Sequence, residues 1–437
     1  MRLTPQWIDW FDRPAADSGL VGEFSSVVDP KSLLEESPEP IWPGLMPPDL
    51  LPLIGNSMGD WLCGRVGADD TIVEVVHWYH GGGDCLPYGD TIAEAILYDA
   101  LASRFPGKAR RLAVPATDQL EPTTDSLRTT PSLRWATDHL PPQAGEVLRA
   151  DFPVADTAHH LLGLGIAVVP LCCDLTLAAL DNELLRRMTP QTAALLEARW
   201  EHDVVRWMFD TRNLPPEIAQ RLAVLWALPA ADWRTQDWET ARVHCRQVAD
   251  RRDDLAWAHD ILGWAAERDG DLTTAISHYR HGALTSVFSD QAVRFRTHFE
   301  SDRVCKFSVA RLVQLNAADQ LDAEYVSHLR MAQGAMESES PGWRDRVSDY
   351  WLRHARSADA ASATTDRSSP KASTELAAAQ RYQTLYRAGW DVGCDSIRRY
   401  CQLLGELAEA AEAARQLGRA SLARTHQACL RARYLFG

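Results

Sequence analysis

Two glycine-rich segments carry residues whose types and spacing are typical of ester hydrolysis. The stretch "GNSMG" at 55–59 matches the G-x-S-x-G turn that exposes a nucleophilic serine, here Ser57, and "HGGG" at 80–83 matches the oxyanion loop of esterases. A nucleophile elbow needs a strand before the serine and a helix after it, but the residues that follow predict a second strand. His80 also comes after the serine, although esterases place this loop before it. A serine esterase is therefore a remote alternative, and we predict no catalytic residue.

The same stretch holds side chains of the types that bind zinc, namely His77, His80, Cys63, Cys85 and Asp84. The two histidines lie three residues apart at a strand end, where side chains point in different directions, and Cys63 lies on the other arm. We expect these histidines to cap backbone groups or fill the core, and we expect no metal or cofactor. The nine cysteines include no C-x-x-C pair, which indicates reduced and mostly buried thiols.

A β-hairpin and the bends around it must position these residues. β-Branched and aromatic residues at 61–66 and 71–78 predict two paired strands, separated by a turn at "GADD". Trp61 and Trp78 stand one on each arm, as an aromatic cross-strand pair would. The segment "TIAEAILYDAL", which opens with a T-x-x-E capping box, predicts a helix that packs on the sheet.

Small and polar residues shape the bends around this hairpin. Asp60 can hydrogen-bond back onto the turn before it, and Asp84 or His80 can hold the free amides that follow the second strand. Pro87 leads the chain extended towards the helix. The glycines that we expect to shape the segment are Gly55, Gly59, Gly81, Gly82, Gly83 and Gly89.

In its order of elements, the stretch 41–105 resembles the Smi/Knr-type domain of the SUKH superfamily. The likeness rests on "LPLIGNSMGDWLCGRV", then on a strand ending "VVHWYHGGGDCLPYGD", and then on the helix "TIAEAILYDAL". The resemblance implies an α+β domain in which a helix packs on a small mixed or antiparallel sheet. It also implies a non-enzymatic function, because SUKH-type domains in bacteria are regarded as immunity proteins that bind and neutralise toxins.

Composition divides the chain into five regions, of which the first is this SUKH-like domain. An irregular connection rich in Pro, Thr and Asp follows, then a mainly α-helical region, a low-complexity linker, and a C-terminal helical hairpin broken near Gly418. The hairpin is too small to stand alone, so we expect it to lie against the other helices. In chain order the regions are 1–105, 106–158, 159–355, 356–374 and 375–437.

The helical region contains a tetratricopeptide-like repeat at 226–290. In "WAHDILGWAAERDGDLTTAISHYRHGA", the small Gly263 and Ala275 let two antiparallel helices approach, and Tyr279 fills the gap beside them. The segment "WETARVHC" aligns with "LTTAISHY", which places Ala241 34 residues before Ala275, the period of such repeats. Stacked helical repeats bind proteins on their concave faces. This region therefore predicts that the protein binds a partner, a role that requires no catalysed reaction.

Most of the acidic charge lies in the first region of the chain. Residues 1–105 hold 17 Asp and Glu against 5 Lys and Arg, within a formal net charge of −15 for the whole chain. This balance argues against nucleic-acid binding, which needs clustered basic residues. The longest apolar run, "LLGLGIAVVPLCC", is too short to span a bilayer and the N-terminus lacks a signal-peptide core, so we expect a cytoplasmic protein without membrane contact.

An acidic domain attracts basic protein surfaces, which leads to the first functional hypothesis. In it, the protein binds and neutralises a basic bacterial toxin through exposed acids near the loops. The candidate acids are Asp60, Asp69, Asp70, Asp84 and Asp90. In the second hypothesis the protein is a regulatory scaffold, whose helical repeats bind the partner while the N-terminal domain positions them.

Overall fold

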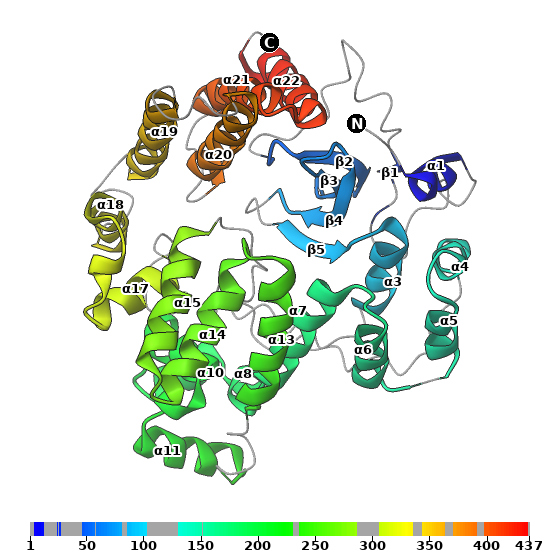
Figure 1. Ribbon diagram of the computed structural model, residues 1–437. Coiled ribbons are helices and arrows are strands. Elements are labelled where there is room, and N and C mark those ends of the chain that lie inside the picture. The colour runs from blue at the N-terminus through cyan, green and yellow to red at the C-terminus, as the bar shows by residue number, and fades with distance from the viewer. Residues whose placement is uncertain are drawn as a thin grey trace.

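The computed structural model describes most of the chain, and its N-terminal region forms a sheet while the remainder is mostly helical (Figure 1). This confirms the expected layout of an α+β part followed by a helical part. Among the described residues, no helix combines the length and the hydrophobicity that crossing a bilayer requires. The described residues are 4–12, 24, 26–27, 46–56, 58–80, 85–102, 130–150, 152–229, 236–285, 306–334, 343–362, 370–390 and 397–435.

The sheet has five antiparallel strands in chain order, so that each strand pairs with the next. The predicted hairpin is confirmed as β3 and β4, in which Trp61 lies opposite Trp78. The segment with Pro87, which we expected only to lead towards the helix, is a further strand that pairs with β4. The strands are β1 (Ser26–Val27), β2 (Leu50–Gly55), β3 (Trp61–Val66), β4 (Ile72–Trp78) and β5 (Cys85–Gly89).

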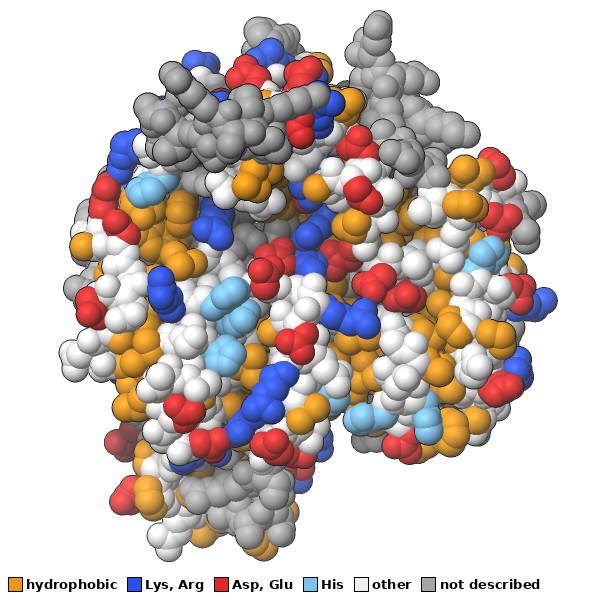
Figure 2. Space-filling model, in the orientation of Figure 1, with side chains coloured by type: hydrophobic (Ala, Val, Ile, Leu, Met, Phe, Trp, Pro, Cys, Tyr) orange, Lys and Arg blue, Asp and Glu red, His pale blue; other side chains and the backbone are white. Residues whose placement is uncertain are grey.

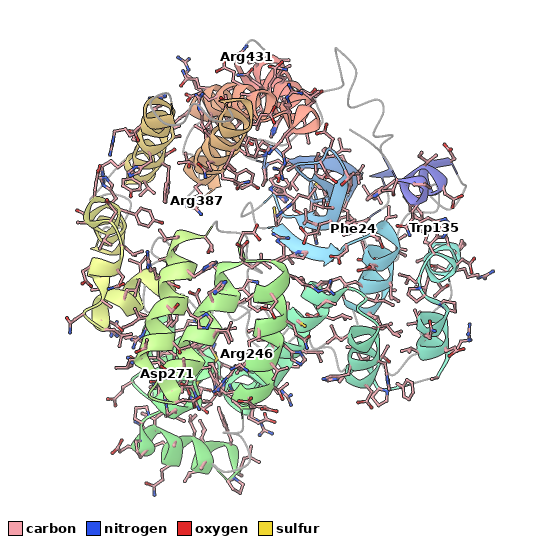
Figure 3. All side chains as sticks on the ribbon, in the orientation of Figure 1. Phe24, Trp135, Arg246, Asp271, Arg387 and Arg431 are labelled. Carbon is pink, nitrogen blue, oxygen red and sulfur yellow. The ribbon has the colours of Figure 1, made fainter. Side chains whose placement is uncertain are left out.

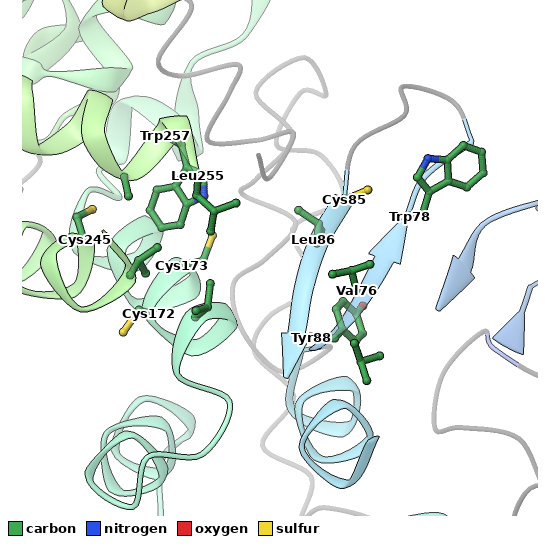
Figure 4. Packing of buried hydrophobic residues seen from close by; sticks show 14 of the residues in the cluster. Val76, Trp78, Cys85, Leu86, Tyr88, Cys172, Cys173, Cys245, Leu255 and Trp257 are labelled. Carbon is green, nitrogen blue, oxygen red and sulfur yellow. The ribbon is translucent and has the colours of Figure 1, made fainter. Parts of the chain in front are cut away.

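Two helices pack against β5. In α3 (Ile92–Ala102) the predicted cap is present, because Glu94 N donates a hydrogen bond to the Thr91 hydroxyl at 3.2 Å. The helix then packs its apolar residues against β5. α7 (Val168–Ala179) also packs on β5, and Figure 4 shows Leu86 on the side of the strand that faces the cysteines of α7. All seven cysteines that the structure describes are buried free thiols, as the sequence indicates.

The other helices fall into two groups. Before residue 230 the chain forms short helices, namely α1 (Pro5–Asp12), α4 (Pro131–Asp138), α5 (Pro142–Arg149), α6 (Val154–Gly163), α8 (Glu183–Arg187), α9 (Pro190–Leu195), α10 (Val205–Phe209) and α11 (Pro216–Trp226). After residue 236 it forms the helical array, which comprises α13 (Trp238–Arg251), α14 (Ala256–Arg268), α15 (Leu272–Leu284), α17 (Phe307–Gln314), α18 (Ala323–Gly334), α19 (Trp343–Ser362), α20 (Pro370–Trp390), α21 (Ile397–Ala413) and α22 (Leu417–Leu430).

Successive helices of the array pack against one another in a curved row, with one 3-10 turn between α17 and α18 (Figure 1). On the other side of the molecule, Figure 3 shows Trp135 of α4 close to α1, where its ring meets Trp10 with centroids 4.8 Å apart. The array and these short helices therefore contact different parts of the N-terminal region.

Two segments that we predicted to be irregular contain helices. The region 106–158 holds α4, α5 and the start of α6, because Thr130 caps α4 with its side chain and the proline after it suits the first helical position. In the predicted linker 356–374, α19 continues to Ser362 and α20 begins at Pro370. The alanines of this low-complexity sequence have high helix propensity, which outweighs the small polar residues between them.

The C-terminal region differs from the predicted hairpin because it contains three helices. The break between the last two lies at 414–416, near the predicted position, and Gly418 belongs to the first turn of α22. α20 packs on α19 and α21 forms ion pairs with it, so this region lies against the other helices, as expected. It also reaches the sheet region, where the Tyr400 hydroxyl donates a hydrogen bond to the Met46 carbonyl. The C-terminal helices therefore contact the residues that precede β2.

Candidate functional site

Antiparallel pairing gathers one set of carboxylates near a single end of the sheet. β2 and β4 start at this end, and β3 and β5 finish there. We call these carboxylates the acidic end of the sheet, and they are Asp49, Asp70, Glu74 and Asp90. The opposite end, which we call the glycine end, is defined by Gly55, Gly59, Asp60 and His80.

Two arginines bind the buried carboxylates of the acidic end. Arg65 of β3 has its Nε 3.8 Å from a carboxylate oxygen of both Asp49 and Glu74. Arg252, in the turn between α13 and α14, pairs with Glu74 and places its Nε 2.6 Å from Asp254 Oδ1. A guanidinium nitrogen of Arg65 also reaches Asp254 at 3.2 Å. Three carboxylates and two guanidinium groups therefore join the sheet to the helical array.

Burial and charge act in opposite directions on these carboxylates. Burial raises the pKa of Glu74 above its usual value, although Arg252 and Arg65 oppose the rise. Burial acts in the same sense on Asp254, but the two arginines outweigh it and lower the pKa of that carboxyl. Removing one partner from such a cluster leaves a buried charge uncompensated, so the cluster stabilises the fold only as a whole.

The last helices of the chain complete the acidic end. The Tyr386 hydroxyl of α20 donates a hydrogen bond to Asp49 Oδ1 at 3.1 Å. Burial, together with the charge of Asp49, raises the pKa of Tyr386, so that it stays a neutral donor. At the N-terminus of α22, Gly418 N donates to Asp70 Oδ1 at 2.6 Å, and Arg419 Nε donates to the last carbonyl of β3 at 2.9 Å. A carboxylate in this position is stabilised by the helix dipole.

Asp90 forms the outermost contact of the acidic end. It pairs with Arg251, the last residue of α13, at 3.1 Å, and the side chains of Asp90 and Arg251 are 52% and 42% exposed. Figure 2 shows acidic and basic side chains together around the hollow on the face where the sheet meets the helices. The described carboxylates of the acidic end are thus bound by groups of the same chain.

The structure separates the five acids that the sequence proposes for partner binding. Asp70 and Asp90 lie at the acidic end, in contact with the helical array. Asp69 lies in the same turn as Asp70, is exposed, and accepts a hydrogen bond from a neighbouring threonine hydroxyl at 2.8 Å. Asp60 lies at the opposite end of the sheet and is buried, so it offers no exposed contact. Asp84 lies outside the described residues.

The glycine end binds its carboxylate with nearby partners. His80 Nδ1 lies 2.8 Å from Asp60 Oδ1, the His80 backbone N donates to the same oxygen at 2.9 Å, and Asn56 donates to the other oxygen at 3.3 Å. Burial alone would raise the pKa of Asp60, but His77, His80 and Asn56 together hold it well below its usual value. Gly59 has a φ of +93°, which this tight turn requires.

The other small residues of this segment serve close packing. A Cβ atom on Gly55 would lie 3.2 Å from the ring of Trp61, and one on Gly89 would lie 2.6 Å from the Glu94 side chain. Trp78 is buried. The run Gly81, Gly82 and Gly83 lies outside the described residues.

The glycine end does not have the context of a nucleophile elbow. β2 leads into a turn and then into β3, so that a strand stands where an elbow needs a helix. Ser57 itself lies outside the described residues. In the part of the chain that the structure describes, no three His, Cys, Asp or Glu side chains gather so that they could hold a metal ion.

In the helical array, α14 and α15 approach at the residues that the sequence indicates. A Cβ atom on Gly263 would lie 2.5 Å from the ring of Tyr279, so only glycine fits there, and Ala275 is fully buried. Asp237 and Asp271 cap α13 and α15 in the same way, since each carboxylate accepts a hydrogen bond from the backbone N three residues on. Figure 3 shows Asp271 at the start of α15.

Three histidines of α14 and α15 lie together, which the sequence analysis did not single out. His259 Nδ1 is 3.3 Å from His278 Nδ1, and the ring of His259 stacks on His281 with centroids 3.9 Å apart. Burial lowers the pKa of His259 most, and the charges of the neighbouring histidines lower it further, to about 3. This ring is therefore neutral at physiological pH. Their spacing gives no sequence signal, because the three residues come from two helices.

Sequence reasoning also missed most of the acidic end. Glu74 and its partner Arg252 lie 178 residues apart, so no local pattern connects them. A strand interior that carries a glutamate, and a helix end followed by "RRDD", were the available signals.

No protein-family model, curated protein or solved structure matches this chain.

Proposed function

We propose that this protein binds another protein through its helical array, while the N-terminal sheet holds two distant parts of the array in place. The observation that carries the proposal is the array itself, in which each helix from α13 to α22 packs on the next, except that α17 and α18 are joined through a 3-10 turn. Proteins built in this way expose long continuous faces that suit a protein partner. The α13–α14 turn and α20 both contact the acidic end, so the sheet sets the distance between them.

Helices α13 to α15 are the part of the array for which we propose a tetratricopeptide-like character. The caps at Asp237 and Asp271 are 34 residues apart, which is the period of such repeats. The contact between Gly263 and Tyr279 supports the same interpretation, because it brings two antiparallel helices close together.

Exposed apolar side chains provide the test of this proposal. Val243 of α13 and Leu272 of α15 are 41% and 48% exposed, and Met58, in the turn at the glycine end, is 56% exposed. A protein that co-purifies with the full chain is identified by mass spectrometry and then bound again in purified form. We expect the change Val243→Asp with Leu272→Asp to weaken this binding, and Met58→Asp to leave it unchanged. The reverse pattern would show that the N-terminal domain carries the binding surface.

The second candidate function is neutralisation of a basic toxin by the N-terminal domain, as the SUKH resemblance implies. The concentration of acidic residues in 1–105 favours it, because opposite charge speeds association. The test mixes the full chain with basic nuclease toxin domains and measures residual nuclease activity. We expect inhibition of at least one toxin, and we expect Asp69→Lys with Asp90→Lys to weaken it; inhibition that survives this reversal would exclude these acids as the contact surface.

A further inference from the structure

We propose that the three histidines between α14 and α15 make the helical array sensitive to acid. While their rings are neutral, α15 stays packed on α14, and when the rings take up protons in mildly acidic surroundings the contact between the two helices opens more often. A partner bound to the array would then be released by acidification, and this consequence rests on the function proposed above for the array.

His259 of α14 meets two rings of α15. Its Nδ1 lies 3.3 Å from His278 Nδ1, and its ring stacks on that of His281 with centroids 3.9 Å apart. His259 is only 7% exposed, and its Nε2 has no hydrogen-bond partner among the described residues. Figure 2 shows histidine side chains gathered on this face of the array. A polar contact between the two helices therefore consists of imidazole rings alone.

The contact between His259 and His278 requires a particular protonation state. A hydrogen bond between two ring nitrogens needs one N–H group and one lone pair, which a neutral imidazole provides. One added proton can be shared by the pair, but a second proton leaves two N–H groups facing each other. A charge on the buried His259 ring also loses its hydration. The packed arrangement therefore suits the neutral rings and disfavours the doubly protonated pair.

The groups around the cluster do not compensate added positive charge. From α13, Arg246 acts on His278 as a further positive charge. From the turn between α13 and α14, Asp253 contributes its backbone carbonyl, which accepts a hydrogen bond from His281 Nε2 at 2.9 Å. Asp260, next to His259 in α14, binds Ser308 of α17. Among the described residues, no carboxylate forms an ion pair with any of the three rings.

The direction of the pKa shifts gives the sign of the effect. The pKa of His259 is about 3 in the folded chain, below the value of about 6.5 of a solvated histidine, and burial also lowers the pKa of His278. The stabilising contribution of the neutral rings is therefore complete above about pH 6.5 and is lost as the pH falls below it. For His259 alone, opening becomes about tenfold more favourable between pH 7.5 and pH 5.5.

Hydrogen exchange of the full chain, followed by mass spectrometry without a partner, tests this inference. Exchange rates in α15 at pH 7.5 and pH 5.5 are each divided by the rate of an unstructured peptide at the same pH. We expect protection of α15 in the parent to fall about tenfold on acidification. His259→Asn keeps a polar group near the position of Nδ1 but takes up no proton, so the fall should largely disappear. The buried His244 of α13 is present in both proteins, so its contribution cancels in this comparison.

A second pair of variants changes only exposed residues, so it tests the inference even where His259→Asn does not fold. Arg246→Glu places a carboxylate beside His278 and should reduce the fall in protection, because it favours the charged rings in the packed state. Arg280 of α15 is also exposed and does not act on His259 or His278. Arg280→Glu therefore makes the same change in net charge and should leave the fall unchanged.

Three outcomes would overturn the inference, namely equal protection of α15 at both pH values, an undiminished fall in His259→Asn, or the same fall in both glutamate variants. Because no partner is present, the result is independent of the proposed function. The expected fall without any partner binding would reject only that function, whereas partner binding by a chain that shows no fall would reject only the acid sensitivity.

Discussion

The two ends of the N-terminal sheet bind carboxylates in different ways. At the glycine end, Asp60 is held by Asn56 and His80, which are 4 and 20 residues away. At the acidic end, Glu74 and Asp49 are held by Arg252 and Tyr386, which are 178 and 337 residues away. The first arrangement joins the turn before β3 to the end of β4 within the sheet, whereas the second connects the sheet to the middle and the end of the helical array.

This difference indicates which substitutions should lower the unfolding free energy of the whole molecule most. The partners of Asp60 lie within the sheet region itself, so these hydrogen bonds of the glycine end involve no residue of the array. The contacts of the acidic end form only when the sheet, the α13–α14 turn and the last helices of the chain come together. If one of these segments is displaced, a buried charge loses its partner, which raises the free energy of that state. Substitutions at the acidic end should therefore be costly in its interior and mild at its surface.

The largest effect is expected for Arg252→Ser. The change leaves the buried Glu74 and the partly exposed Asp254 with Arg65 in place of two guanidinium partners, which costs about 3 kcal/mol of unfolding free energy. Urea unfolding of the full chain measures this loss, and Arg187→Ser, which removes a surface pair, is the control. A loss below about 1 kcal/mol would mean that the buried cluster does not hold the sheet and the array together.

The sequence predicts the glycine end better than the acidic end, for a physical reason. Trp61 opposite Trp78 and the turn at Gly59 follow from strand alternation and turn chemistry, which act over a few residues. The role of Asp70 and Asp90 depends on groups that arrive from α13 and α22, so the sequence indicates their charge but not their partners.

The next largest effect is expected for Asp60→Asn at the glycine end. The amide keeps one oxygen for the two His80 groups, but its NH2 group replaces the oxygen that accepts from Asn56, and the negative charge beside the histidines is lost, which costs about 1–3 kcal/mol near pH 7. The pKa of Asp60 is lower in the folded state than in the unfolded state, so its stabilising contribution is present above the unfolded pKa of about 4 and is lost as the pH falls. Urea midpoints of the parent and variant should therefore converge on acidification; a difference that is constant with pH would contradict the assignment.

A smaller effect at the same end is expected for Gly59→Ala. The φ of +93° is unfavourable for a residue with a Cβ, and the strain costs about 1–2 kcal/mol. A Cβ there would stand 3.5 Å from the His80 ring, an ordinary contact, so backbone strain is the only source of the loss. Thermal unfolding compares it with Gly163→Ala, and equal melting temperatures for the two variants would show that this turn is not strained.

The smallest effect is expected for Arg251→Ser, at the surface of the acidic end. Its pair with Asp90 is half exposed and screened by water, so its loss should change the unfolding free energy by about 0–1 kcal/mol, and still less at high salt. Urea unfolding at two salt concentrations, with Arg187→Ser alongside, measures this change. The small value follows from the same contrast that gives Arg252 a large one, because the two neighbouring arginines differ chiefly in burial. A loss as large as that of Arg252→Ser would mean that the outer contact is part of the interior cluster.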